Sequence, residues 1–490
     1  MGLGRNLSKE ADVRTSFSRR LGLAADWCDV AQLTVDMLPD VALLRIFDFY
    51  REITDSEWRV LVQVCRKWRI VVFGSPRRLR LQLNITPRTP VKETLDVWPP
   101  LPINIEVDAL GEDEGVDNIL AALKHNDRTC EIILNNVPSS QLETILSELQ
   151  KPFPTLSSLC IFSIHETAPV QPDSFLGGSA PSLRALILKF IPFPGLPKLL
   201  LSATSLVSLD LRYNHHSGYI SPEALVTSLS VLTRLKCLFI DFDSPLSHPD
   251  WKGHRPLPLT RPLLPDLASL WFKGASKYLE YLVARIDAPL LHDLAITFFH
   301  QQLFDTPQFA QFLSRTLNKA LDKARVVLGP DSLLVTLPPS FDGGLRVYLA
   351  FSHSQSDWLL LSLAQICSSS LPQALIQAVE HLYISDSRPP LHRRDDIESN
   401  RWLEVLHPFT AVKGLYISRE FMPSITPALQ ELVGERVTEV LPALQTLFLE
   451  EPLSSESGPV QETIGQFVAA RQLAGRPTAI SCWEGKVGDQ

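Results

Sequence analysis

Asp241 and Asp243 are the residues whose types and spacing come closest to supporting a reaction. On a β-strand, residues two positions apart point to the same face and lie about 7 Å from each other. Two carboxylates at such a separation can act as a general acid and a general base. Nothing in the sequence around the two aspartates indicates a pocket, so we assign them no catalytic role.

The histidines and cysteines show no pattern typical of a metal site or of a nucleophile. His215 and His216 are neighbours in a polar loop segment, which is typical of solvated side chains, and His292 and His300 are too far apart along one strand to share a metal. The 7 Cys residues contain no CxxC spacing. Phosphate-binding, zinc-protease and nucleophile-elbow motifs are also absent from the sequence. We therefore expect a protein that is not an enzyme and that uses neither a metal nor a cofactor.

The composition is that of a folded protein with no attraction for nucleic acid or membranes. Hydrophobic residues make up 45% of the 490 residues and charged residues 20%, which is typical of globular proteins. This length exceeds what one hydrophobic core usually supports, so several domains or a repeat array are expected. The net charge of -8 disfavours binding to phosphate backbones. No segment approaches the roughly 18 consecutive apolar residues of a membrane span, and the dispersed cysteines favour a cytoplasmic or nuclear protein.

Residues 34–80 have the pattern of a small helical module, which follows a polar segment over residues 1–33 that we expect to be flexible. Pro39 favours the start of a helix, because its fixed φ and missing N–H suit the first turn. The apolar residues that follow at helical spacing are Leu43, Phe47 and Tyr50.

A second helix is predicted from about Ser56 to Phe73, and it has two apolar stripes. One stripe contains Trp58, Leu61, Val62, Cys65 and Val72, and the other contains Val64, Trp68 and Val71. A short helix that is apolar on two sides must bury both. One side can pack within the module, and the pattern leaves open whether the other contacts the domain that follows or a separate protein.

The two predicted helices, with the runs LPDVALLRIFDFY from Leu38 and WRVLVQVCRKWR from Trp58, resemble the F-box. The residues that match the family pattern are Leu38, Pro39, Leu43, Ile46, Phe47, Val64, Cys65, Trp68 and Arg69. Val41 stands where the family usually has an acidic residue. The segment from Thr86 to Pro99 extends the resemblance to the F-box proteins that are abundant in mushroom-forming (basidiomycete) fungi.

This resemblance implies a partner for the helical module. In the family, the module binds a Skp-type adaptor that connects it to the cullin scaffold of a ubiquitin ligase. Transferred to this sequence, the adaptor-binding residues would be Leu38, Pro39, Leu43, Ile46, Phe47, Val64 and Trp68. The alternative for each of them is an ordinary place in the protein's own core.

One phrase recurs over residues 130–452: an apolar residue, two spacers, a leucine, one spacer and a second apolar residue. The central leucines are Leu159, Leu186, Leu209, Leu238, Leu270, Leu294, Leu382, Leu415 and Leu447. This is the pattern of a leucine-rich repeat with irregular repeat lengths. Each phrase predicts a short strand with its leucines facing inward. The long interval between Leu294 and Leu382 is expected to hold one or two degenerate repeats, near Leu334 and Leu349.

The segments between the phrases are predicted to cover the inward side of the strands. Those from Gln141 to Gln150 and from Thr306 to Arg325 have helical periodicity. Because no repeat can bury its apolar face alone, the repeats must stack. We therefore predict an α/β fold, in which the helical module precedes a leucine-rich-repeat solenoid with a parallel concave sheet. A doubly wound α/β sheet is less favoured, since the strands lack a Gly-rich phosphate turn. Residues 81–129 would connect or cap the array, and residues 453–490 would form a C-terminal cap or tail.

The residue between the two inward positions of each phrase should face the concave surface. This row contains five aromatic residues, which are Phe239, Trp271, Tyr383, Tyr416 and Phe448, and it also contains Asp210. Two residues further on, the same face carries Arg212, Asp241 and Lys273. Interfaces favour such aromatic residues, so we predict that these nine residues bind a target protein. Two alternatives stay open: stacking of the aromatic rings on one another for stability, and cover of the rings by the tail after Glu451 or by a loop from the long interval.

The hypothesis that joins these predictions is a substrate receptor of a cullin-type ubiquitin ligase, which holds a target and performs no chemistry itself. The alternative is an interaction scaffold outside any ligase, in which the helical module only caps the repeats. A third possibility, an enzyme, would require a pocket with converging polar groups that the sequence does not indicate.

Overall fold

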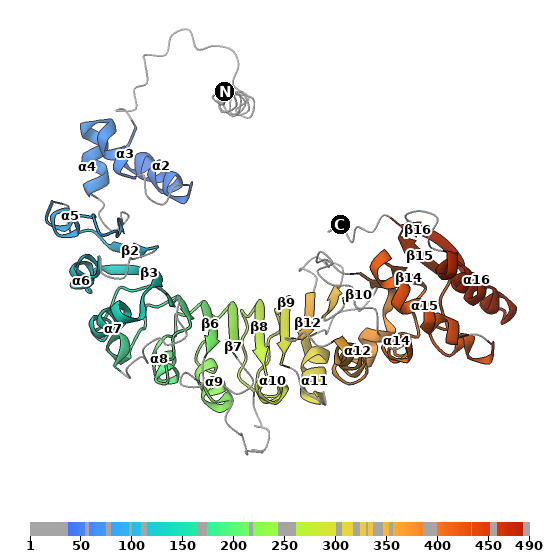
Figure 1. Cartoon of the computed structure of the whole chain (residues 1–490). Helices are drawn as coiled ribbons and strands as arrows, with labels where there is room; N and C mark the ends of the chain where they lie inside the picture. The colour runs from blue at the N-terminus through green and yellow to red at the C-terminus, as the bar shows by residue number, and fades with distance from the viewer. Residues whose placement is uncertain are drawn as a thin grey trace, which may run out of the picture. The chain divides into compact units, whose positions relative to one another are not determined.

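The computed structural model describes residues 38–53, 58–74, 80–97, 100–108, 115–163, 174–214, 219–243, 261–299, 306–316, 324–329, 332–336, 346–351, 356–385, 399–432, 434–450 and 458–483. The chain forms two compact units, Met1–Arg80 and Leu81–Gln490 (Figure 1). The segment predicted to be flexible, residues 1–33, lies outside the described residues.

The described residues of the first unit form three packed helices, α2 (Asp40–Ile53), α3 (Trp58–Val64) and α4 (Arg66–Gly74). α2 begins where Pro39 predicts, and the Pro39 carbonyl accepts hydrogen bonds from the amides of Ala42 and Leu43. The prediction of one continuous second helix was wrong, because the helix is interrupted at Cys65, between α3 and α4. The Cys65 Sγ accepts a hydrogen bond from the Trp68 amide at 3.4 Å, as the side chain of a helix N-cap does. The interior of the unit contains Leu43, Phe47, Leu61, Val62, Val71 and Val72.

The described strands of the second unit form one sixteen-stranded sheet. In sheet order they are β1 (Leu81–Asn84), β2 (Ile103–Val107), β3 (Thr129–Val137), β4 (Ser158–Ser163), β5 (Ala185–Lys189), β6 (Ser208–Asn214), β7 (Cys237–Phe242), β8 (Ser269–Gly274), β9 (Asp293–Phe298), β12 (Arg346–Phe351), β11 (Ser332–Thr336), β10 (Ala324–Leu328), β13 (Val379–Ile384), β14 (Gly414–Ile417), β15 (Thr446–Glu450) and β16 (Ala479–Trp483). The sheet thus begins before residue 130 and continues past residue 452.

The helices of the second unit lie along one face of this sheet (Figure 1). They are α5 (Val91–Val97), α6 (Val116–Leu123), α7 (Ser139–Glu148), α8 (Leu196–Ser202), α9 (Pro222–Leu229), α10 (Ser276–Val283), α11 (Pro307–Thr316), α12 (Ser356–Gln365), α13 (Gln373–Gln377), α14 (Ser399–Leu406), α15 (Met422–Glu431) and α16 (Gly458–Leu473). All nine central leucines of the recurring phrase are fully buried. The prediction that the leucines face inward is confirmed, and the open α/β sheet is compatible with a solenoid.

The interval between Leu294 and Leu382 departs from the predicted parallel sheet. β11 is antiparallel to both β10 and β12, and β12 rather than β10 pairs with β9. Short strands on neighbouring turns of the chain can pair antiparallel without a long crossover. The helix predicted over Thr306 to Arg325 is present as α11, described as far as Thr316, but it does not reach Arg325, which lies in β10. Of the two leucines expected in degenerate repeats, Leu349 is buried as predicted, whereas Leu334 points to the other face.

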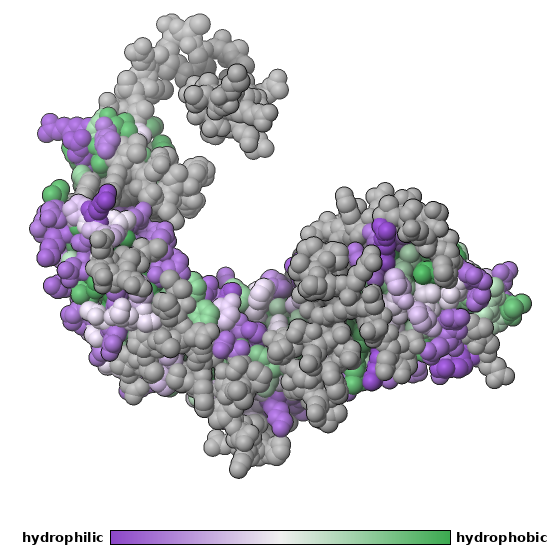
Figure 2. Space-filling model, viewed as in Figure 1, coloured by the Kyte–Doolittle hydropathy of each residue, from purple (hydrophilic) through white to green (hydrophobic). Residues whose placement is uncertain are grey.

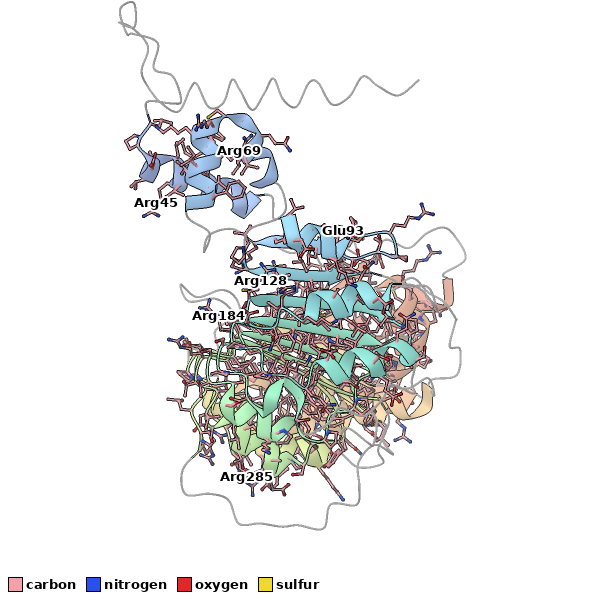
Figure 3. All side chains as sticks on the ribbon, turned by 90° about the vertical axis from the view of Figure 1, so that its left-hand side faces the viewer. Arg45, Arg69, Glu93, Arg128, Arg184 and Arg285 are labelled. Carbon is pink, nitrogen blue, oxygen red and sulfur yellow. The ribbon has the colours of Figure 1, made fainter. Side chains whose placement is uncertain are left out.

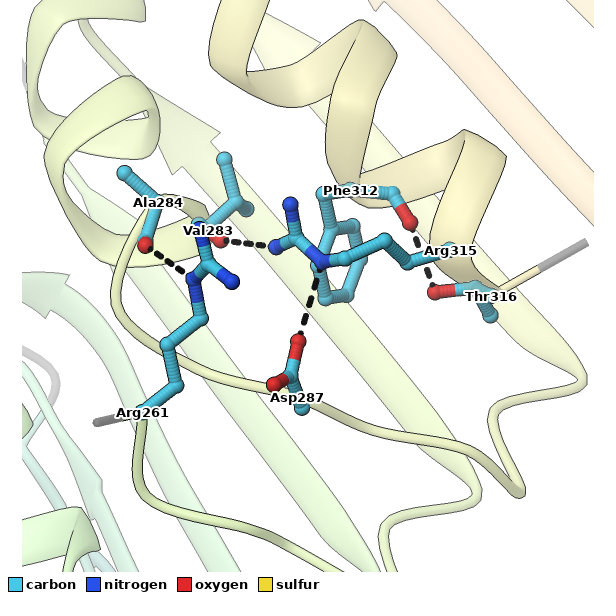
Figure 4. A network of polar contacts seen from close by, with 7 residues as sticks. All are labelled: Arg261, Val283, Ala284, Asp287, Phe312, Arg315 and Thr316. Carbon is cyan, nitrogen blue, oxygen red and sulfur yellow. Dashed lines mark hydrogen bonds and ion pairs between the residues drawn. The ribbon is translucent and has the colours of Figure 1, made fainter. Parts of the chain in front are cut away.

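Arginine side chains that donate to backbone carbonyls hold neighbouring turns of the second unit together. The Arg315 Nη2 donates to the Val283 carbonyl at 3.1 Å, its Nε donates to Asp287 Oδ1 at 3.0 Å, and the Arg261 Nε donates to the Ala284 carbonyl at 2.8 Å (Figure 4). These carbonyls belong to the C-terminal end of α10, where positive charge is favourable. The contacts therefore join α11 and the segment before β8 to the same helix end.

Arg471 of α16 is a buried arginine that also donates to backbone carbonyls of neighbouring segments. Its three kinds of donor are all used: Nε donates to Thr478 Oγ1 at 2.8 Å, Nη1 to the Val437 carbonyl at 3.1 Å and Nη2 to the Leu444 carbonyl at 3.1 Å. The side chain is fully buried, and this burial lowers the pKa of its guanidinium. Arg471 thus joins α16 to the segments that lead into β15 and β16.

We predict that Arg471→Met loosens the C-terminal end of the sheet, because three buried acceptors lose a donor. A loss of about 2 kcal/mol or more of local stability corresponds to roughly 30-fold faster amide exchange in β15 and β16. Hydrogen–deuterium exchange of the full chain measures this. Arg476→Met, at an exposed arginine five residues on, is the matched control; the same acceleration in both variants would contradict the role assigned to Arg471.

No helix in the described part of the chain combines the length and the apolar character that crossing a membrane requires.

Candidate functional site

The helical unit keeps several large apolar side chains outside its core. Ile46 of α2 is 47% exposed and Val64 of α3 is 55% exposed, and Leu38, just before α2, is 36% exposed. Val41 and Ile70 are more exposed still. Figure 2 shows hydrophobic residues reaching the surface of this unit among hydrophilic ones. Three residues of the F-box pattern therefore have apolar surface available for a partner.

Polar contacts fix the positions of these exposed residues. The Lys67 Nζ donates to the Leu38 carbonyl at 2.8 Å, which holds the segment before α2 beside α4. The Arg69 Nε donates to the Val62 carbonyl at 3.0 Å and so ties α4 to α3. Arg45, which precedes Ile46 in α2, is itself exposed, and both arginines lie at the surface of the unit (Figure 3).

The other adaptor-binding residues of the prediction are placed differently. Leu43 is fully buried and Phe47 is 6% exposed, and the Phe47 ring meets the ring of Trp68 edge-on at a centroid distance of 4.9 Å. Leu43, Phe47 and the half-buried Trp68 therefore form part of the unit's core and support the exposed positions from beneath. Pro39 is exposed and caps α2. Of the seven predicted residues, those open to direct contact are Leu38, Pro39, Ile46 and Val64.

The second candidate surface is the open face of the sheet, which we define as the face opposite the helices. Strand pairing places one residue from every strand in a single row across this face. From β1 to β16 in sheet order, the open-face row is Asn84, Glu106, Ile133, Cys160, Ile187, Asp210, Phe239, Trp271, Ala295, Tyr348, Leu334, Val327, Tyr383, Tyr416, Phe448 and Ser481. The row thus contains all five predicted aromatic residues and Asp210. It also contains Tyr348, which sequence reasoning missed because its repeat lacks the leucine phrase.

The three C-terminal aromatic residues of the row stack on one another. The rings of Tyr383 and Tyr416 lie 4.1 Å apart at 14°, and those of Tyr416 and Phe448 lie 4.2 Å apart at 2°. The Trp483 ring meets Tyr416 edge-on at 5.6 Å, and the Trp483 Nε1 donates to the Ile417 carbonyl at 3.2 Å. Burial raises the pKa of Tyr416 to about 12. Ring stacking and cover by the C-terminal strand, the two alternatives to target binding, therefore both occur at this end of the row.

Phe239 and Trp271 are arranged more openly. Their rings are tilted by 49° with centroids 5.3 Å apart, and Trp271 is 45% exposed. The next residue of the row is the small Ala295, which cannot cover the indole. The Trp271 Nε1 donates to Asp293 Oδ2 at 3.2 Å, so one edge of the ring is anchored. Trp271 is thus an accessible aromatic side chain whose position is fixed by its hydrogen bond to Asp293.

The charged residues predicted for this surface pair with one another. The Arg212 Nε lies 2.8 Å from Asp210 Oδ1, and the Lys273 Nζ lies 3.1 Å from Asp241 Oδ1. The hydrogen bond that Arg212 donates to Asp210 raises the pKa of Arg212, whereas burial raises the pKa of Asp241. The Arg212 guanidinium also lies over the Phe239 ring, 5.1 Å from its centroid. The four residues form a mixed-charge border beside Phe239 and Trp271.

Of the two aspartates Asp241 and Asp243, Asp241 forms an ion pair with Lys273. The residues His215, His216 and His300 lie outside the described residues. Within the described part of the chain, no group of three or more His, Cys, Asp or Glu side chains is placed to hold a metal ion. The two surfaces that remain are suited to binding macromolecules.

Comparison of the sequence with protein-family models and with curated proteins finds no match.

The contrast between the two groups of aromatic residues gives a prediction for stability. Tyr416→Ala removes a ring that is packed on both sides and by Trp483, so we expect a loss of about 3 kcal/mol in the free energy of unfolding. Trp271→Ala removes a side chain that is 45% exposed, and we expect a loss below about 1 kcal/mol. Chemical denaturation followed by circular dichroism measures both. Equal losses would show that Trp271 is as much a structural residue as Tyr416.

Proposed function

We propose that this protein is a substrate receptor of a cullin-type ubiquitin ligase. In this proposal the helical unit is an F-box that binds a Skp-type adaptor, and the second unit is a leucine-rich-repeat solenoid that binds the target. The observation that carries the proposal is the exposure of apolar side chains at F-box positions, 36% for Leu38, 47% for Ile46 and 55% for Val64.

The physical argument rests on the two sets of apolar residues in the helical unit. Leu43 and Phe47 are buried in the core of the unit. They therefore explain why α2 packs there, but not why its outer side is also apolar. Ile46 lies next to Phe47 and yet faces outward. Several large apolar side chains that folding leaves exposed on one small unit favour a binding interface. A protein partner that covers these side chains, as a Skp-type adaptor does in the F-box family, would bury them.

The second unit supports the other half of the proposal. Its open face carries an accessible tryptophan, Trp271, bordered by paired charges, a combination of aromatic and polar groups that is favourable at protein interfaces. The mechanism would be proximity, since a bound target is held near a ubiquitin-charged enzyme elsewhere in the complex. The proposal includes a cytoplasmic or nuclear location and assigns the chain no catalytic residue, no cofactor, and no binding of nucleic acid or membrane.

The test is co-purification of the full-length chain with a Skp-type adaptor. We expect the wild type to form a stoichiometric complex, and the double variant Ile46→Glu, Val64→Glu to lose it, because two charges would have to be buried at the interface. We expect the double variant to keep its fold, since both side chains are exposed. Circular dichroism and gel filtration check this.

Val97→Glu is the matched control, because Val97 is an equally apolar side chain, 78% exposed, on α5 of the second unit. It should leave adaptor binding unchanged. A wild-type chain that forms no complex would instead favour the scaffold alternative, in which the helical module only caps the repeats. Loss of the complex in the Val97 variant as well would mean that added charge, and not the F-box positions, disrupts binding.

A further inference from the structure

The strands β10, β11 and β12 bring two arginines together on the open face. Strand pairing aligns Arg325 of β10 with Thr336 of β11, and Thr336 with Arg346 of β12. Side chains that are aligned in this way point to the same face of the sheet. Because neighbouring strands lie about 4.8 Å apart, the two arginines are about 10 Å apart. The reversed order of these strands produces this pair, which is not evident from the sequence.

The donors of these two arginines are not used within the described residues. Arg346 is exposed, and neither arginine forms an ion pair with a described residue. Asp293, the acid aligned with Arg346, accepts a hydrogen bond from Trp271 instead. The Arg325 guanidinium lies over the Tyr383 ring, 4.1 Å from its centroid, and its Nε is buried without a hydrogen bond. By contrast, Arg212 and Lys273 are both paired with aspartates.

An apolar floor lies beside the two arginines, in the open-face row. Between Trp271 and Tyr383 the row contains Ala295, Tyr348, Leu334 and Val327, all of them half-buried. These six residues come from six adjacent strands and span about 24 Å. An extended chain covers that distance with about seven residues. The floor therefore has the length of a short linear peptide.

We propose that this part of the open face binds an extended peptide of about seven residues, with apolar side chains on the floor and an oxyanion held by Arg325 and Arg346. This inference rests on the proposed function and specifies the kind of target segment it would recognise. Guanidinium groups bind phosphoryl and carboxylate oxygens through paired hydrogen bonds. Two long side chains about 10 Å apart can converge on one phosphoryl group. They can equally hold two carboxylates about three residues apart in an extended peptide.

The charges of the surrounding surface favour a peptide over a nucleic acid. Binding to a phosphate backbone depends on many cations that follow its repeated charges. Here the two arginines are flanked on the same face by Asp293 and His381, the residues aligned with Arg346 and Arg325, and the chain as a whole carries a net charge of -8. Such a surface suits one or two localised negative charges next to apolar side chains.

Oriented peptide libraries test the proposal with the full chain. Each fluorescent library has degenerate positions around a fixed centre, which is phosphoserine in the first, Glu-x-x-Glu in the second, and Gln-x-x-Gln in the third. We expect the first or the second to bind about tenfold tighter than the third in fluorescence anisotropy, as charge-assisted hydrogen bonds predict. Preference for the first assigns a phosphorylated segment, and preference for the second assigns an acidic one.

Arg346→Gln should remove this preference, and because Arg346 is exposed the variant is expected to fold. Arg325→Gln should also remove the preference. Because Arg325 packs on the Tyr383 ring, circular dichroism must show that this variant is folded. Arg234→Gln, at an exposed arginine on the turn before β7, is the matched control and should keep the preference.

Three results would overturn the proposal: equal binding of all three libraries, a preference that survives Arg346→Gln, or tighter binding of a fluorescent oligo-uridine than of any peptide library. Co-purification with the adaptor is measured on the same chain. If adaptor binding is kept while the libraries show no preference, this inference fails and the proposed function stands. If adaptor binding is lost while the preference is present, the site is a peptide site outside a ligase.

Discussion

The register of the strands is the constraint on which the second unit depends. Side chains alternate between the two faces of a strand, so a shift by one residue would exchange the buried face and the open face. A buried leucine in each recurring phrase, such as Leu238 or Leu415, fixes that register against the helices. The residue after each of these leucines is thereby placed in the open-face row. Packing on one side of the sheet thus decides which side chains are available on the other.

The two ends of the aromatic row use this placement in different ways. Tyr383, Tyr416 and Phe448 lie on adjacent parallel strands, so their rings meet face to face, and Trp483 of the last strand packs edge-on against Tyr383 and Tyr416. At Trp271 the neighbouring strand supplies only Ala295, and the indole stays accessible. Aromatic residues of the row therefore stabilise the sheet where their neighbours are also aromatic. Where the neighbour is small, as beside Trp271, the aromatic side chain stays accessible for binding.

The helical unit shows a similar division between neighbouring residues. Phe47 packs on Trp68 inside the unit, while Ile46, one position earlier, faces outward. A helix turns by about 100° per residue, so adjacent positions cannot share a face. The family resemblance alone placed both residues in one adaptor-binding set. Their packing separates residues that support the surface from those that can form it.

The sequence by itself determined the start of α2 at Pro39, the inward leucines and five of the aromatic residues in the open-face row, because these follow from local geometry and from periodicities of two and 3.6 residues. It did not indicate the break at Cys65, because cysteine is not a usual helix N-cap residue, or the antiparallel β11, which interrupts the expected parallel repeats. The position of Trp483 depends on contacts with residues distant in the chain. The pairing of β12 with β9 is the clearest case. That pairing, which no local pattern specifies, places Arg346 and Arg325 on one face beside Tyr348, and only the tertiary structure decided it.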